Sequence, residues 1–185
     1  MLPVLDGDWV GIDVSTDVAG RAAASAPIVQ ADVRRLPFDD ASFSGVLSTS
    51  TLDHFRDKGA IDLSLTEIRR VLALGGTLVL TLDNPTNPLI RLRNSLPRRL
   101  QDATGLVPFP VGPTLSEREG RCGLAQAGFE VLDVAYLLHA PHVVATRLAR
   151  FSRWERRALP AFDRLGATSL ARFTGHYVAF LARAG

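Results

Sequence analysis

The chain has 185 residues, enough for one domain with a sizeable core, and its 46% hydrophobic and 22% charged residues are those of an ordinary globular protein. A single cysteine, Cys122, excludes an internal disulfide and a cysteine-based zinc site, and it favours a reducing, cytoplasmic compartment. We see no basic and apolar leader and no run of about 18 apolar residues, so we expect neither a signal peptide nor a membrane span.

The net charge of +2 hides an asymmetry between the two halves of the chain. Residues 1–90 carry 7 Lys and Arg against 12 Asp and Glu, whereas residues 91–185 carry 14 Arg against 7 Asp and Glu. A basic second half fits an anionic substrate, a membrane surface or nucleic acid, although a solvated arginine-rich surface is the simpler interpretation.

In the first half, short apolar runs alternate with segments of helical periodicity. We expect strands at residues 10–15, 28–32, 45–50 and 77–83, with helices at 16–26 and 61–76, the second ended by Gly75 and Gly76. The strands are continuous apolar runs, which is typical of a parallel sheet covered on both faces. The predicted fold is therefore α/β, with residues 10–83 in a common parallel sheet.

The second half is less regular. We expect an interrupted helix at 87–105, a proline-rich loop at 106–113, and a helix at 116–129 that begins with a capping box of Ser116 and Glu119. One or two basic helices follow at 142–162. Strands are predicted at 130–138 and 176–183, the last of them antiparallel. Residues 86–115 and 142–170 are expected to cover the strand ends and form a substrate pocket.

Polar side chains follow several of these strands at what would be one edge of the sheet, where open parallel sheets bind their ligands. Asp13 could accept hydrogen bonds from two ribose hydroxyls, and Asp32 from an exocyclic adenine amine. Asn84 could face a substrate. Each aspartate alone is weak support, because aspartates also end strands by suiting turns.

Three segments together resemble a known family: GIDVS, VQADVRRLPFDDASFSGVLSTSTLDHF and EIRRVLALGGTLVLTLDNP. They are similar to the core of class I S-adenosylmethionine-dependent methyltransferases, closest to the group of the ubiquinone and menaquinone biosynthesis enzymes. The resemblance runs from Val10 to Pro85, and the rest of the chain shares only the family's layout. It implies a three-layer, Rossmann-like, mostly parallel sheet with an antiparallel C-terminal strand.

The resemblance also implies an activity, which is methyl transfer from S-adenosylmethionine to a small-molecule acceptor. Residues 1–185 would be one domain, with a cofactor-binding half at 10–85 and an acceptor cap with closing strands at 86–185. The implied contacts of the cofactor are the ribose with Asp13 and its neighbour Val14, the adenine with Asp32 and the Val33 backbone, and the methionine part with Ser48 and Thr49.

His54 follows the strand that faces the transferred methyl group in this family, and a neutral imidazole there could act as a general base. The alternative is a histidine that orders its loop. Methyl transfer needs no protein base in every case, because the sulfonium is already a strong electrophile and positioning supplies much of the acceleration. The other three histidines lie in separate predicted elements, so we expect no metal site.

The family's first strand and its glycine-rich turn, of the type D.GCG.G, have no counterpart before the strand at Val10. Only about ten residues precede that strand, whereas a βαβ unit needs about 30. We therefore expect an N-terminally shortened methyltransferase that binds its cofactor weakly, with a strand ladder that is open or repacked.

The sequence also allows alternatives to methyl transfer. A non-catalytic binding or regulatory protein with the same fold is the main alternative, and a nicotinamide dehydrogenase is disfavoured because its dinucleotide fingerprint is missing. We expect no nucleic-acid binding, since aromatic and basic residues are not interleaved on a platform. Leu148, Phe151 and Trp154 could touch a membrane surface or a lipid-like acceptor. An anionic or partly apolar acceptor would suit the arginines of the cap: Arg91, Arg93, Arg98 and Arg99.

Overall fold

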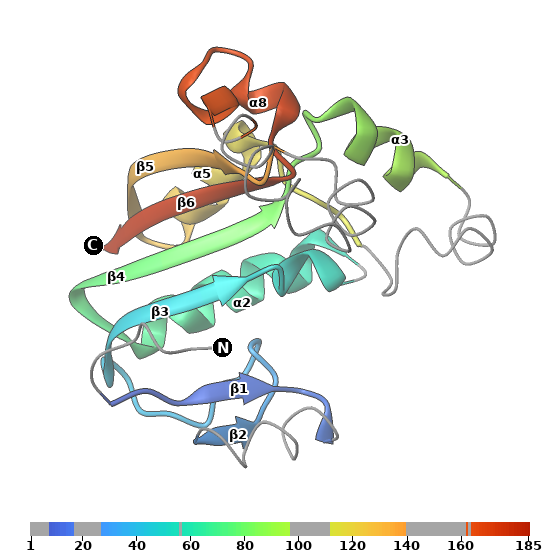
Figure 1. The fold of residues 1–185 in the computed structure, drawn as a ribbon. Helices are drawn as coiled ribbons and strands as arrows, with labels where there is room; N and C mark the ends of the chain where they lie inside the picture. The colour runs from blue at the N-terminus through green and yellow to red at the C-terminus, as the bar shows by residue number, and fades with distance from the viewer. Residues whose placement is uncertain (1–7, 17–26, 56, 97–111, 140–161, 163) are drawn as a thin grey trace, which may run out of the picture.

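The computed structural model describes residues 8–16, 27–55, 57–96, 112–139, 162 and 164–185, which form a layered α/β arrangement (Figure 1). The α/β class predicted from the sequence is confirmed. The elements in chain order are β1 (Gly11–Asp13), β2 (Ile28–Gln30), β3 (Phe43–Thr49), η1 (Leu52–His54), α2 (Lys58–Val71), β4 (Leu72–Asp83), α3 (Pro88–Ser95), α5 (Glu117–Gln126), β5 (Phe129–Leu137), η2 (Arg164–Ala167), α8 (Ala171–Thr174) and β6 (Tyr177–Ala184).

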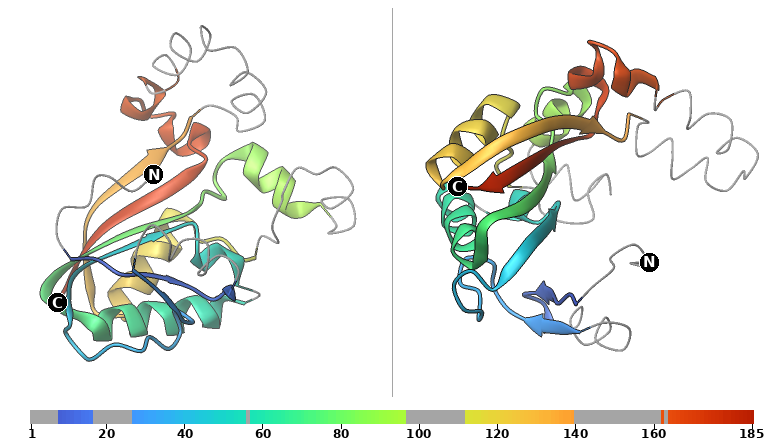
Figure 2. Two further views of the ribbon diagram at one scale, coloured as in Figure 1. Left: turned by 60° about the horizontal axis from the view of Figure 1, so that its bottom comes forward. Right: turned by 90° about the vertical axis from the view of Figure 1, so that its left-hand side faces the viewer.

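The main sheet has four strands in the order β3-β4-β6-β5. β3 and β4 are parallel, and β6 runs antiparallel to both of its neighbours, which confirms the expected antiparallel final strand. Helices α2 and α5 lie together on one face of this sheet (Figure 2). Both helices therefore pack against the same face of the main sheet.

Strands β1 and β2 form a second, two-stranded parallel sheet, in the register Gly11↔Ile28 to Asp13↔Gln30. The expectation that residues 10–83 share one sheet is therefore wrong. Among the described strands, β1 pairs only with β2, and β3 pairs with β4 alone. The hydrogen-bonded ladder is interrupted between β1 and β3, and this open ladder is one of the two outcomes that the sequence led us to expect.

The core lies between the main sheet and its two helices. Apolar residues of α2 recur every three or four positions, so they line one side of the helix and face the strands. The fully or nearly fully buried residues of the core are Ile61, Leu65, Ile68, Leu78, Leu80, Leu82, Leu124, Val178 and Phe180. Gly120 of α5 rests against the Phe180 ring, where a Cβ atom would lie 2.3 Å from Cζ. The glycine therefore permits the close approach of α5 to β6.

Two local expectations have different outcomes. The helix predicted over 61–76 is α2, but it ends at Val71, and Leu72 to Gly76 already belong to β4. The pairing register with β3 shifts between Phe43 and Gly45, and Gly75 takes a φ of +76°, so this stretch is a bulge at the start of the strand. In α5 the predicted capping box of Ser116 and Glu119 is confirmed.

The predicted helices at 16–26 and 142–162 and the segment 97–111 lie wholly or almost wholly outside the described residues. Within the described part of the chain, none of the helices combines the length and the apolar character that crossing a membrane would require.

Candidate functional site

The loops after β2 and β3 meet at the carboxyl edge of the two sheets. The Arg34 guanidinium, which follows β2, lies over the Phe55 ring, which follows η1, at 5.1 Å from the ring centroid. This contact links loops that leave two separate sheets. The loops after β2 and η1 are therefore neighbours, and a ligand-binding edge formed by the polar groups at the strand ends stays a prediction.

Asp13 and Val14 end β1. The Asp13 carboxylate accepts a hydrogen bond at Oδ1 from the backbone N–H of Ser15, at 2.7 Å. Gln30 in β2 donates to the Val14 carbonyl oxygen at 3.2 Å, which fixes the backbone there. The Val14 side chain is 69% exposed, so an apolar surface lies beside the carboxylate that the resemblance assigns to the ribose.

Asp32 is held by Arg34 in this structure. Its carboxylate accepts from the Arg34 backbone N–H at 2.9 Å and from the Arg34 guanidinium at 2.5–3.1 Å. These hydrogen bonds hold the pKa of Asp32 below its ordinary value. An adenine amine could reach Asp32 only if Arg34 gave up part of this pairing. The neighbouring Val33 is partly buried and packs against the core.

Ser48 and Thr49 end β3. Ser48 is buried and is paired in register with Leu80, whereas Thr49 is exposed and is paired with Thr81. The next residue, Ser50, takes a φ of +47°, and its N–H donates to both the carbonyl and the hydroxyl oxygen of Thr81 at 3.1 Å. The chain therefore turns sharply away from the sheet directly after the predicted cofactor residues.

A clamp from α2 fixes the loop that carries the LPF motif. Arg70 donates to the carbonyl oxygens of Leu36 and Phe38 and pairs with Asp40, and it is bound by Glu67 at 2.8 Å. Glu67 also accepts the Leu36 N–H at 2.8 Å, and the Arg70 hydrogen bonds lower the pKa of Glu67. These contacts give both side chains a structural role.

A cluster of titratable groups lies at the ends of β3 and β4. Asp53 is only 2% exposed, and its Oδ2 accepts from the Asp83 N–H at 3.1 Å. Its Oδ1 is 3.9 Å from Nε2 of His54. Asp83, which is also buried, is ion-paired with Arg93 of α3, and its Oδ1 lies 3.6 Å from Nε2 of His176.

Burial raises the pKa of Asp53, the nearby Asp83 carboxylate raises it further, and His54 opposes both effects. Asp53 was missed by the sequence reasoning, as was the Arg34 partner of Asp32. The pairing of Arg34 with Asp32 could have been predicted, because an Asp with a basic residue two positions later suits a turn. Asp53 is recognisable only as a polar residue placed directly after the apolar Leu52, a pattern that surface loops share.

Asn84 does not face a ligand in this arrangement. Its amide group donates to the carbonyl oxygens of Arg172 and Gly175 at 2.8 and 3.0 Å, and its Oδ1 accepts the Thr86 N–H at 3.0 Å. The side chain is only 1% exposed. Asn84 therefore joins the end of β4 to the segment before β6, and the proposed contact with a substrate is corrected to a structural role.

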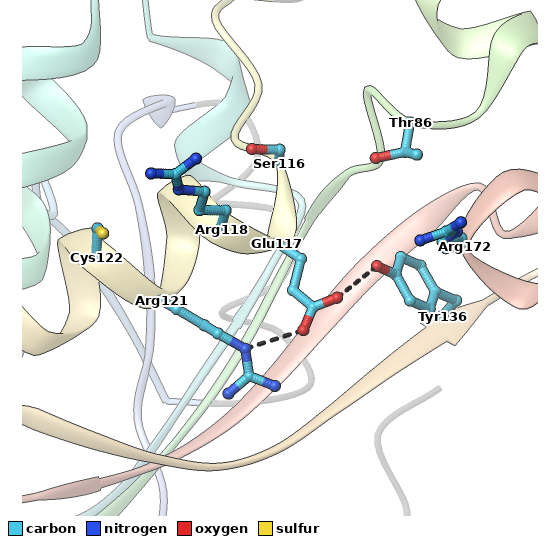
Figure 3. A pocket seen from close by; sticks show the side chains of 8 residues that line it. All are labelled: Thr86, Ser116, Glu117, Arg118, Arg121, Cys122, Tyr136 and Arg172. Carbon is cyan, nitrogen blue, oxygen red and sulfur yellow. Dashed lines mark hydrogen bonds and ion pairs between the residues drawn. The ribbon is translucent and has the colours of Figure 1, made fainter.

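A shallow pocket of about 450 Å³ lies at the start of α5, apart from the predicted residues (Figure 3). In its centre Glu117 accepts from Arg121 at 2.9 Å and from the Tyr136 hydroxyl at 2.8 Å. Burial, with the Glu117 carboxylate, raises the pKa of Tyr136 to about 12. The lining residues are Thr86, Ser116, Glu117, Arg118, Arg121, Cys122, Tyr136 and Arg172. Three arginines against one glutamate make this pocket basic.

Metal-binding groups were also sought. Within the described ranges, no three residues among His, Cys, Asp and Glu are placed to hold a metal ion. His139 is buried, with its ring nitrogens 2.8 Å from the Thr174 hydroxyl and 2.9 Å from the Tyr136 carbonyl oxygen, so it has a structural role.

Comparison with known proteins adds a partial sequence match and a shared fold to this geometry. Residues 2–80 match the family model described as a methyltransferase domain. Over 60 residues the chain is 40% identical to a protein of Encephalitozoon cuniculi that is named as a methyltransferase, and the match covers 32% of this chain and 29% of that protein. The matched part is thus less than a third of the relative's length.

Solved structures share the fold over most of the chain. A SAM-dependent methyltransferase of Thermotoga maritima aligns with a TM-score of 0.64 at 18% identity, covering 95% of this chain and 72% of that one. A Haloferax volcanii complex between the Trm112 methyltransferase activator and a methyltransferase aligns with a TM-score of 0.60 at 22% identity, covering 95% and 71%. These likenesses show that the chain shares the fold of these methyltransferases, and residues 2–80 match the methyltransferase domain model.

Proposed function

We propose that this protein transfers a methyl group from S-adenosylmethionine to a small-molecule acceptor. The observation that carries the proposal is the meeting of two parallel strand pairs at their carboxyl ends, joined by the contact of Arg34 with Phe55. The match of residues 2–80 to a methyltransferase domain supports a cofactor site at this edge. The proposed cofactor contacts are Asp13, Val14, Asp32, Val33, Ser48 and Thr49.

The chemistry asked of these residues is modest. The cofactor supplies an electrophilic methyl group, so the protein must bind it, exclude water and align the acceptor. Asp13 would accept from the ribose hydroxyls while keeping its hydrogen bond from Ser15. The apolar surface of Val14 would cover the sugar. Ser48 and Thr49 would contact the amino-acid end of the cofactor, because β3 ends there.

We further propose that this chain binds the cofactor weakly. Two observations support the proposal: β1 and β3 have no common strand partner among the described strands, and Asp32 is already paired with Arg34. An adenine amine would have to displace part of the pairing of Asp32 with Arg34, and each hydrogen bond given up costs about 0.5–1.5 kcal/mol.

The acceptor is proposed to be anionic or partly apolar, which the basic second half and the basic pocket beside α5 support. Arg93, one of the arginines expected to bind it, is ion-paired with Asp83, whereas Arg91 is exposed. Arg98 and Arg99 lie outside the described residues. The exposed thiol of Cys122 suits the reducing, cytoplasmic compartment that we propose.

A second candidate is a non-catalytic binding or regulatory protein with the same fold. The ion pair of Asp32 with Arg34 favours it, because that pair occupies the carboxylate that adenine would need. The Haloferax volcanii methyltransferase was solved with an activator protein, so a protein partner is compatible with this fold. Binding of the cofactor separates the two candidates.

The test is calorimetric titration with S-adenosylmethionine and with S-adenosylhomocysteine. We expect weak, saturable binding that Asp13→Asn reduces at least about tenfold, since a charged hydrogen-bond acceptor is lost. Asp39→Asn is the matched control, because Asp39 is an exposed aspartate in the loop after β2. Absence of any saturable binding would support the non-catalytic candidate. Equal affinities of the Asp13 and Asp39 variants would remove Asp13 from the site.

A further inference from the structure

Asp53 has a buried carboxylate, and one of its two oxygens accepts no hydrogen bond among the described residues. Oδ2 accepts the Asp83 N–H at 3.1 Å, whereas Oδ1 has no hydrogen-bond partner among the described residues. The residue is 2% exposed, so water does not replace the missing partner readily. A buried acceptor without a partner costs about 1–3 kcal/mol, so its presence calls for a physical reason.

Among the residues that the structure describes, His54 is the cationic side chain that approaches that oxygen. Asp83 on β4 is the nearest carboxylate, and the cations next to it serve Asp83: Arg93 from α3 is ion-paired with it, and Nε2 of His176, before β6, is 3.6 Å from its Oδ1. His54 has its Nε2 3.9 Å from Oδ1 of Asp53, and its side chain is 42% exposed. His54 therefore has one ring edge toward the buried carboxylate and also reaches the surface of the cluster.

We propose that Asp53 is the positioning residue of His54: Oδ1 accepts the N–H at Nε2 and so leaves the lone pair of the imidazole on Nδ1. The proposal rests on the proposed methyl transfer, in which His54 is the candidate base. The present distance of 3.9 Å is longer than a hydrogen bond and requires a shift of about 1 Å. Catalytic hydrogen bonds are often long before ligands bind.

In this step one proton would pass through His54. The acceptor atom forms its bond to the methyl carbon while the carbon–sulfur bond breaks, and the acceptor's proton passes to Nδ1 of His54. The imidazolium formed is then stabilised by the Asp53 carboxylate, and it returns the proton to water. Burial and the nearby Asp83 carboxylate raise the pKa of Asp53, and a positive charge on His54 opposes that rise.

The test uses the tautomer of His54, which needs no knowledge of the acceptor. Nitrogen-15 NMR of the histidine-labelled full chain, with S-adenosylhomocysteine present, distinguishes Nε2–H from Nδ1–H rings. His54→Gln assigns the signal among the 4 histidines. We expect Nε2–H to predominate by at least about tenfold in the wild type, because a hydrogen bond to a charged group is worth that much.

Asp53→Asn should invert this preference. The amide oxygen takes over the hydrogen bond from the Asp83 N–H, so the amide NH2 faces His54 and donates to Nε2, which forces the proton onto Nδ1. The same substitution gives the wrong tautomer in the serine-protease triad. Asp39→Asn, at an exposed site, should leave the tautomer unchanged. A His54 that stays Nε2–H in folded Asp53→Asn, or that is Nδ1–H in the wild type, would overturn the proposal.

A second measurement covers the case in which Asp53→Asn does not fold. The wild type should show a Nε2-bound proton that is protected from exchange and disappears in His54→Gln, and its absence would refute the hydrogen bond. Calorimetric titration with S-adenosylhomocysteine keeps the two hypotheses apart. If the wild type does not bind S-adenosylhomocysteine, the proposed function is contradicted. If the His54 tautomer is unchanged in Asp53→Asn, only the role of Asp53 is contradicted.

Discussion

Replacing Gly120 by alanine tests how closely α5 packs on the sheet. A Cβ atom at this position would lie 2.3, 2.9 and 3.0 Å from three carbons of the Phe180 ring. Carbon atoms in contact are normally about 3.5–4.0 Å apart, so α5 or the ring must move by about 1 Å. Phe180 is completely buried between the sheet and the helices, which leaves it little space to move.

The expected cost follows from two opposing effects. Overpacking a core typically costs about 1–3 kcal/mol, whereas glycine to alanine within a helix gains up to about 1 kcal/mol. We therefore expect Gly120→Ala to lower the free energy of unfolding by about 1–2 kcal/mol, or the melting temperature by roughly 2–8 °C for a chain of this length. Urea unfolding followed by circular dichroism measures it.

Gly123 of the same helix is the matched control. Its added Cβ would lie 3.6 Å from Cδ1 of Leu65, an ordinary contact. Gly123→Ala should therefore stabilise the protein by about 0.5–1 kcal/mol, the opposite sign. Phe180→Leu should reduce the penalty of Gly120→Ala in the double variant. Equal stabilities of the two alanine variants would refute the close packing of α5 on β6.

Three further predictions concern contacts around the site. Arg70→Met should speed amide hydrogen exchange in residues 36–40, because it removes the clamp on that loop, whereas Arg121→Met on α5 should leave the loop unchanged. Asn84→Ala should lower the free energy of unfolding by about 2–4 kcal/mol in urea titrations, because the three hydrogen bonds of the buried Asn84 side chain are lost. A variant as stable as the wild type would contradict these hydrogen bonds. The pKa of Glu119, held by Lys58 and Ser116, falls from 4.5 to about 2, so its stabilising effect is present above pH 4.5 and is lost as the pH falls toward 2. The wild type should therefore exceed Glu119→Gln in stability at pH 7, by up to about 1 kcal/mol because the pair is partly exposed, and the two should converge near pH 2.

Sequence reasoning succeeded where a local pattern decides the structure. The strands predicted at 77–83, 130–138 and 176–183 are apolar runs bounded by breakers, and each lies in a strand of the main sheet. Ser116 and Glu119 form the predicted capping box because both partners lie within one helical turn. The antiparallel direction of β6 also agrees with the layout of the family.

It failed where contacts between distant residues decide. The helical period of α2 continues through Leu72, yet Leu72 is extended, is paired in register with Phe43 and begins β4. Its N–H still donates to the Ile68 carbonyl oxygen, and its side chain is buried. The separation of β1 and β2 from the main sheet depends on which strands find partners, and no local pattern reports that. Asn84 was misread for the same reason, since its partners Arg172 and Gly175 are distant in the sequence.

The residues of the candidate site also divide into those that a local pattern predicts and one, Asp53, whose burial depends on distant contacts. Asp13 and Asp32 were predicted because strand ends are recognisable, whereas Asp53 is buried only through packing against the end of β4. A buried carboxylate beside a second carboxylate opposes stability, since burial and Asp83 both raise its pKa and so favour its neutral form. Because the folded-state pKa is raised, its contribution to stability is fully present below the unfolded pKa and is lost as the pH rises through the folded value. An ionised Asp53 carboxylate is therefore unfavourable at this position beside the end of β4. Such local costs are usual where a fold supports chemistry rather than stability, and this coincidence is the physical reason to connect Asp53 with His54.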